Sequence, residues 1–152
     1  MTHSIYRTLQ ERLDTYSLGF PSTPSGVEIE ILKELFSEQD AELFLALTPM
    51  LETPETVAGR LGRPTDEITA RLEDMAGRQL LFRLKKNDTA RYGAIPFVHG
   101  LFEFHTTEMT RRLAELVEQY YKEGFKQTMA SNAEGFLRTI PVQKSIDVTQ
   151  HV

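Results

Sequence analysis

The chain has 152 residues, of which 40% are hydrophobic and 26% charged, and its net charge at pH 7 is −5. This length and composition suit one compact domain, with or without tails, that buries its own core without disulfides or metal staples. The sequence contains no cysteine, which excludes disulfides, thiolate zinc sites, iron–sulfur clusters ligated from this chain and cysteine nucleophiles.

The chain also lacks the apolar segments that membranes and secretion require. No stretch approaches the roughly 20 consecutive apolar residues of a membrane span, and the N-terminus has no apolar run typical of a signal peptide. We therefore expect a cytoplasmic protein with no membrane partner. The negative net charge argues mildly against non-specific binding to nucleic acid.

Residues 1–52 are predicted to form N-terminal helices that pack on the core. The spacing of apolar residues predicts an amphipathic helix over residues 4–16, with a stripe of Ile5, Leu9 and Leu13. Residues 18–26 follow, and their two prolines and two glycines break this helix.

Two further helices are expected in this region. Ser25 and Glu28 have the spacing of a capping box, and the next helix is expected to start at Ser37, with Asp40 three residues on. Apolar residues follow each start at helical spacing. Acidic pairs such as Glu28 and Glu30 have the placement of solvated helix faces.

Residues 53–97 have the pattern of a winged helix-turn-helix. Thr53 is a suitable N-cap and Pro54 a suitable first residue for a short helix that ends at Gly62. Thr65 caps the next helix, whose buried stripe is expected to be Ile68, Leu72 and Met75.

A β-hairpin is predicted to complete the winged helix. Residues 80–85 alternate in the manner of a strand, and Asn87 and Asp88 supply the chemistry of a turn. Residues 91–95 form a plausible return strand before Pro96.

Residues 98–128 are predicted to form one long C-terminal helix. Its apolar band looks broader than a single surface helix needs, so it serves either as an internal core against the first helices or as an interface. We favour an interface between domains or between the chains of a homodimer, formed by Leu101, Met109, Leu113, Leu116 and Tyr120. Residues 129–152 lose the periodicity and are expected to be a tail or linker. All parts together are expected to make one domain, mainly α with a small β-hairpin.

The helix expected to read DNA carries the wrong charge for that role. Residues 65–74 contain four acids against Arg71, a net charge of −3. Phosphates repel such a surface, although the two acids in the first turn also stabilise the helix dipole. The four acids are Asp66, Glu67, Glu73 and Asp74.

The predicted wing has the opposite charge. Residues 78–91 contain five basic residues against Asp88, a net charge of +4, and two further arginines flank the turn between the helices. These residues could bind a phosphate backbone or an acidic protein, or they could be ordinary solvated residues. The candidate contacts for nucleic acid or an acidic partner are Arg60, Arg63, Arg78, Arg83, Lys85, Lys86 and Arg91.

Metal binding and catalysis find little support. The pairs His99/Glu103 and His105/Glu108 have spacings that could ligate a metal, but they do not align on one helix face, so we expect no metal site. The sequence has no Gly-x-Ser-x-Gly elbow and no glycine-rich phosphate loop. We therefore expect a protein that is not an enzyme.

An aromatic group falls at the junction of the wing and the long helix. Core packing is its expected role, because aromatic side chains drive burial strongly, and a ligand pocket is the alternative. The group consists of Tyr92, Phe97, Phe102 and Phe104.

Four segments in order resemble the N-terminal region of a bacterial family of multidomain 4Fe–4S ferredoxin-type proteins. They read LGFPSTPSGVEIEILKELFSEQDAELFLAL, ETVAGRLGRPTDEITARLEDMAGRQLLFR, AIPFVHGLFEFH and FLRTIPVQKSI, and together span nearly the whole chain. The resemblance implies a winged-helix region that precedes a domain with 4Fe–4S cysteine motifs. Because this chain has no cysteine, no cluster ligand carries over. We expect no cofactor in this chain and a cluster only in a domain encoded downstream of Val152.

Residues 53–95 and the long helix after them are also similar, more loosely, to small dimeric winged-helix regulators. Three functions are therefore expected in order of preference. The first is a non-enzymatic interaction or regulatory module of a ferredoxin-type protein, which docks a protein partner or its own downstream ferredoxin domain. The second is a dimeric DNA-binding transcriptional regulator that contacts DNA through the basic wing. The third is a ligand-sensing winged helix with an aromatic pocket.

Overall fold

The computed structural model describes residues 4–126, so the predicted tail or linker over residues 129–152 lies outside the described residues. The elements in chain order are α1 (Ile5–Asp14), α2 (Val27–Leu35), α3 (Glu38–Ala46), α4 (Pro54–Leu61), α5 (Thr65–Gly77), β1 (Phe82–Lys86), β2 (Thr89–Gly93), η1 (Phe97–Leu101), α6 (Phe102–His105), α7 (Arg111–Tyr120) and η2 (Tyr121–Phe125). The predicted class is confirmed, since the described chain is mainly helical with one small antiparallel sheet.

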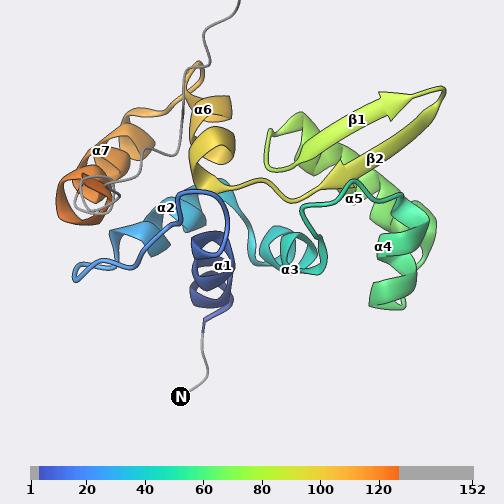
Figure 1. Ribbon diagram of the computed structural model, residues 1–152, viewed down its shortest axis with the longest axis horizontal. Coiled ribbons are helices and arrows are strands. Elements are labelled where there is room, and N and C mark those ends of the chain that lie inside the picture. Colours follow the sequence, from blue (N-terminus) through green and yellow to red (C-terminus); the bar gives the residue numbers. More distant parts are fainter. Residues whose placement is uncertain (1–3, 127–152) are drawn as a thin grey trace, which may run out of the picture.

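The elements form two groups along the long axis of the molecule. Helices α1, α2, α6 and α7 lie at one end, and α4, α5 and the β-hairpin lie at the other, with α3 between them (Figure 1). Helix α3 contacts α1 on one side and α4 on the other. One hydrophobic core runs through both groups.

The sharp turn between α2 and α3 follows from local sequence. Phe36 leaves the helical conformation, with φ −121° and ψ 133°, and Ser37 and Asp40 form a capping box at the predicted start of α3. Phe36 is buried and meets the ring of Phe44 edge-on, with centroids 5.5 Å apart. Local capping and core packing therefore favour the same turn.

The predicted capping box of Ser25 and Glu28 is wrong. The N-cap of α2 is Gly26, with φ 72°, and Glu28 is fully buried rather than on a solvated face. Its carboxylate accepts hydrogen bonds from the backbone N–H and the hydroxyl of Thr23, at 3.1 and 2.6 Å, and pairs with Arg7 at 3.0 Å. Glu28 therefore ties the loop before α2 to α1, which a local pattern cannot reveal.

The hairpin closes through the predicted turn. Asn87 and Asp88 both have positive φ, 49° and 61°, as a tight two-residue turn between twisted strands requires. Strand β1 pairs antiparallel with β2 from Phe82↔Gly93 to Lys86↔Thr89. The other edge of β2 is covered, because Glu52 and Tyr92 exchange backbone hydrogen bonds of 2.8 and 2.9 Å.

The prediction of one long C-terminal helix over residues 98–128 is wrong. His99 has φ 63° inside the irregular turn η1, and the short α6 ends before a new helix begins at Arg111. The hydroxyl of Thr106 donates to the Glu103 carbonyl at 2.7 Å, and the hydroxyl of Thr110 caps α7 by accepting the Leu113 N–H at 3.1 Å. Threonine side chains thus compete with the helical backbone for hydrogen bonds, which favours a break at this point.

The apolar stripe of this region serves as internal core. Helix α7 packs against α2, and Leu101, Leu113, Leu116 and Tyr120 are all buried. Met109 is partly buried against the same core. A contact with a second chain cannot use the four buried side chains while this fold is intact.

Candidate functional site

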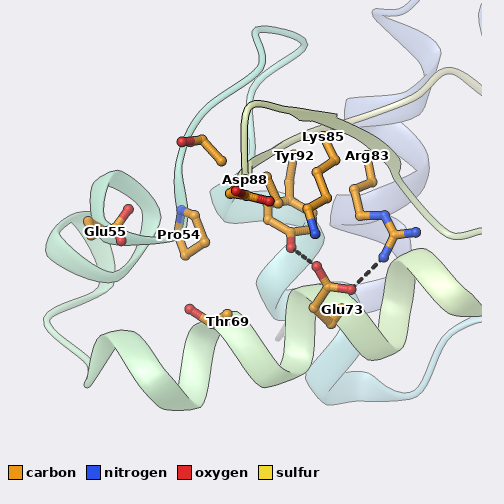
Figure 2. A pocket seen from close by; sticks show the side chains of 10 residues that line it. Pro54, Glu55, Thr69, Glu73, Arg83, Lys85, Asp88 and Tyr92 are labelled. Atoms are coloured by element: carbon orange, nitrogen blue, oxygen red, sulfur yellow. Dashed lines mark hydrogen bonds and ion pairs between the residues drawn. The ribbon is translucent and has the colours of Figure 1, made fainter.

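The basic residues of the predicted wing lie mostly on the hairpin, and a groove lies beside the hairpin in the structure. The groove has a volume of about 600 Å³ and lies between the hairpin and helices α4 and α5. Figure 2 shows Glu73 projecting from α5 towards the hairpin, with Thr69 further along the same helix. The lining residues are Pro54, Glu55, Thr69, Glu73, Arg83, Lys85, Asp88, Thr89, Ala90 and Tyr92.

Glu73 holds the hairpin onto α5. Its carboxylate accepts the Tyr92 hydroxyl and pairs with Arg83 at 2.5 Å (Figure 2). The Tyr92 hydrogen bond lowers the pKa of Glu73, and Arg83 and the charge of Lys85 add to that effect against the opposing effect of burial. Burial, followed by the hydrogen bond to Glu73, raises the pKa of Tyr92. The groove is thus a region of mixed charge.

This arrangement predicts a pH dependence of stability. The pKa of Glu73 is below its ordinary value of 4.5 in the folded protein. The contribution of Glu73 to the free energy of unfolding is therefore complete above pH 4.5, and it is lost as the pH falls through the folded pKa. The side chain is 43% exposed, so we expect a loss of only about 1 kcal/mol. Urea titrations of the wild type and Glu73→Gln at pH 6 and pH 3 should show that the stability difference between them shrinks in acid. An equal difference at both pH values would contradict this role of Glu73.

Four of the seven predicted contact residues are paired with acids of the fold itself. Arg83 binds Glu73, as above. Arg60 binds Glu52 and also donates to the Ala46 carbonyl, and Arg63 binds Glu67 one helical turn away. The hydrogen bond from Arg60 is the largest influence on the pKa of Glu52, which it lowers. Arg60 therefore joins the end of α3 to the bridge before α4.

Arg78 is the fourth of these residues, and it does not line the groove. Its guanidinium donates two hydrogen bonds of 2.9 Å to the carboxylate of Asp40 in α3 and also pairs with Asp74. Burial raises the pKa of Asp40, but hydrogen bonds from Arg78 and Ser37 outweigh it, so the pKa lies below its ordinary value. Its contacts tie α5 to α3, which is a structural role.

Lys85, Lys86 and Arg91 are exposed, and no ion pair to a carboxylate is found for them within residues 4–126. All three lie on the hairpin. The structure therefore does not unite the seven predicted residues into one basic surface, and those of the seven that lack a carboxylate partner within residues 4–126 lie on the hairpin.

Strand β1 presents an apolar face that sequence analysis did not single out. All five of its residues are exposed, and Phe82 and Leu84 remain 43% and 44% exposed. The alternation in this run correctly predicted a strand. An alternating strand normally turns its apolar face to the core, and here the core side is instead filled by Tyr92 from β2.

The histidine considered as a metal ligand at the start of the C-terminal region has a structural role. The ring of His105 lies 2.8 Å from the Leu101 carbonyl and 3.1 Å from the Arg78 carbonyl, so it links α6 to the end of α5. Residues 4–126 contain no group of three or more acidic or histidine side chains placed to hold a metal ion.

The predicted aromatic group divides between three places. Phe97 and Phe102 line an apolar cavity of about 220 Å³ together with Tyr120, Tyr121 and Phe125 of the C-terminal helices. Tyr92 lies in the groove beside α5, and Phe104 is exposed on α6.

Comparisons of the chain with protein-family models, with curated protein sequences and with solved structures find no significant match. Residues 4–126 contain no helix with the length and apolarity that crossing a bilayer requires. The fold alone does not identify the function, so the arrangement of residues in the site has to indicate it.

Proposed function

We propose that this chain is a non-enzymatic winged-helix module that docks a protein partner within a ferredoxin-type (4Fe–4S) redox protein. The partner is either a separate polypeptide or a ferredoxin domain that follows this module in the same chain. The resemblance of its four segments to the N-terminal region of such proteins supports the redox context.

The order of elements supports the winged-helix part of the proposal. Helix α3 is followed by the backbone bridge at Glu52, then by α4, α5 and the hairpin. A winged helix has a three-helix core followed by a hairpin. The second helix of its helix-turn-helix is the one positioned to meet a partner. In this interpretation the unit begins at α3, earlier than Thr53.

The distribution of charge is the observation that carries the docking proposal. Helix α5 exposes acids, and Arg60, Arg63, Arg78 and Arg83 are each paired with a carboxylate of the fold. Phosphate contacts depend on cations that are available to replace counterions. Of the seven candidate cations, the three without a carboxylate partner within residues 4–126 lie on the hairpin, where exposed apolar side chains accompany them. Such a mixed apolar and basic surface suits an acidic protein better than a phosphate backbone.

The alternative is a DNA-binding regulator that grips the backbone through the hairpin. One observation favours it: Lys85, Lys86 and Arg91 all lie on a hairpin beside the second helix of the helix-turn-helix, where a wing can touch the flanking backbone. Dimerisation would have to use a surface other than the buried face of α7.

Titration against mixed genomic DNA fragments at low and moderate salt separates these functions. The docking proposal predicts no retardation at moderate salt. Salt-dependent retardation that Lys85→Glu with Lys86→Glu abolishes would overturn it in favour of DNA binding. The matched control is Arg111→Glu with Lys126→Glu, which changes the net charge equally on exposed residues outside the hairpin.

A positive test uses a 4Fe–4S ferredoxin-type domain from the resembled family, added in trans. Backbone NMR spectra of the isotope-labelled module should show shifts centred on residues 82–93, and these shifts should be absent in the Lys85→Glu, Lys86→Glu variant. Spectra that do not change at saturating concentrations of the domain would contradict docking within a ferredoxin-type protein.

A further inference from the structure

Strand β1 has a free edge that can accept another strand. The hairpin turn has two residues, so Lys86↔Thr89, Leu84↔Arg91 and Phe82↔Gly93 are the pairs that exchange hydrogen bonds within it. The N–H and C=O groups of Arg83 and Lys85 consequently point away from β2. Among the described residues no backbone segment pairs with that side of β1, since the sheet has the order β1-β2 and the bridge to Glu52 uses β2.

The two faces of this edge differ in chemistry. Phe82, Leu84 and Lys86 alternate with Arg83 and Lys85, so the first three share the outer face and the other two share the face towards α5. Phe82 and Leu84, which are neighbours on the outer face, are both apolar and more than 40% exposed. An incoming strand would therefore find apolar contacts on one face and cations on the other.

A hollow at the beginning of β1 extends the apolar face. It has a volume of about 440 Å³ and lies between the end of α5, the start of β1 and α6. Phe82 and the exposed ring of Phe104 both line it. An apolar side chain at the end of an added strand would reach this hollow.

A second copy of the chain is a poor occupant of this edge. In antiparallel pairing, residues whose backbone groups point outward on one strand bond to such residues on the other. Two β1 strands would therefore place Arg83 or Lys85 opposite Arg83 or Lys85 of the other copy. Like charges directly opposite each other destabilise a strand pair.

We infer that β1 binds an extended acidic segment of the partner protein, which adds to the sheet as a strand antiparallel to β1. The segment carries acidic residues opposite Arg83 and Lys85 and an apolar residue opposite Leu84. Main-chain hydrogen bonds supply affinity and the alternating side chains supply specificity, as in other cases of strand addition. This inference depends on the proposed docking function and names the chemistry of the partner.

The two cationic positions are not equivalent. Glu73 already pairs with Arg83 at 2.5 Å, whereas no carboxylate pairs with Lys85 within residues 4–126. The acidic residue opposite Lys85 therefore gains more than the one opposite Arg83. Replacing Lys85 should weaken binding more than replacing Arg83.

Backbone-methylated peptides test the strand addition directly. The probe is a fluorescein-labelled peptide, Gly-Thr-Glu-Val-Glu-Thr-Gly, whose two glutamates would face Arg83 and Lys85. Methylating both glutamate amide nitrogens removes the donors that face β1, and methylating the valine and second threonine nitrogens alters only the far side. The two modified peptides have the same charge and composition.

Fluorescence anisotropy should show that the glutamate-methylated peptide binds roughly tenfold or more weakly than the parent, because two hydrogen bonds are lost. The peptide methylated on the far side should bind within about twofold of the parent. Lys85→Glu should weaken binding of the parent peptide, and Lys126→Glu should not.

Three outcomes would overturn the inference: no binding of the parent peptide, equal binding of the two methylated peptides, or equal binding of a peptide with lysine in place of glutamate. Each leaves the proposed function to be decided separately by the ferredoxin-domain experiment. Binding of the domain with failure of the peptide would place docking on another surface. Failure of both would remove the proposed function together with the inference.

Discussion

Tyr120→Ala is expected to lower the free energy of unfolding by about 3–5 kcal/mol, as for other large buried aromatic side chains. Tyr120 is 1% exposed, and its ring lies 4.9 Å from that of Phe20 and 5.9 Å from that of Phe97. Its hydroxyl donates to the Pro21 carbonyl at 3.1 Å. The variant therefore loses packing between α7 and the loop before α2. Urea unfolding followed by circular dichroism measures the change.

Tyr120→Phe is the matched control, because it keeps the ring and removes only one hydrogen bond. We expect it to cost about 1 kcal/mol. If Tyr120 instead lay in an interface between two chains, Tyr120→Ala would shift the sedimenting mass at moderate concentration while leaving the stability of the monomer near that of the wild type. That result would contradict the internal role of the apolar stripe.

Arg78→Ala is expected to lower the free energy of unfolding by about 2–3 kcal/mol. Removing one partner of a buried ion pair leaves a buried charge without compensation, which costs about 3–5 kcal/mol when both partners are buried. Asp40 has a side chain that is 8% exposed, but Arg78 is 42% exposed, so we place the cost below that range. The carboxylate keeps its hydrogen bond from the Ser37 backbone N–H in the variant, which also limits the loss.

Arg63→Ala serves as the comparison for Arg78→Ala. Its pair with Glu67 is exposed on both sides and lies within one helical turn, so we expect a change below about 0.5 kcal/mol. Parallel thermal and urea unfolding of the two variants measures the difference. Equal effects of the two substitutions on stability would contradict the structural role of Arg78. Unchanged stability with loss of acidic-peptide binding in Arg78→Ala would indicate that Arg78 contacts the partner instead.

Much of the local structure was predictable because the relevant interactions are local. Helix α3 begins where Ser37 and Asp40 stand in capping-box spacing, and the hairpin turns where Asn87 and Asp88 tolerate positive φ. Each of these features depends on residues within a few positions of each other. A sequence pattern therefore contains all of the information that decides them.

The break in the C-terminal helix shows where a periodic pattern misleads. Residues 98–128 keep apolar residues at helical spacing across a segment that is not one helix. Thr106 and Thr110 carry the signal for the break, since their hydroxyls bond to nearby backbone groups. The apolar spacing persists because α6 and α7 still pack against the same core.

By itself, the sequence determined the helical class, the starts of α3 and α4, the hairpin and its turn, and the opposite charges of α5 and the hairpin. Only the tertiary structure decided which of those charges are neutralised. Arg78 meets an acid 38 positions away, and Arg83 meets Glu73 across the groove. It also decided that Glu28 is buried and that the apolar face of β1 points outward. The physical reason is that ion pairing and burial depend on distances between elements, and packing of the whole chain sets those distances.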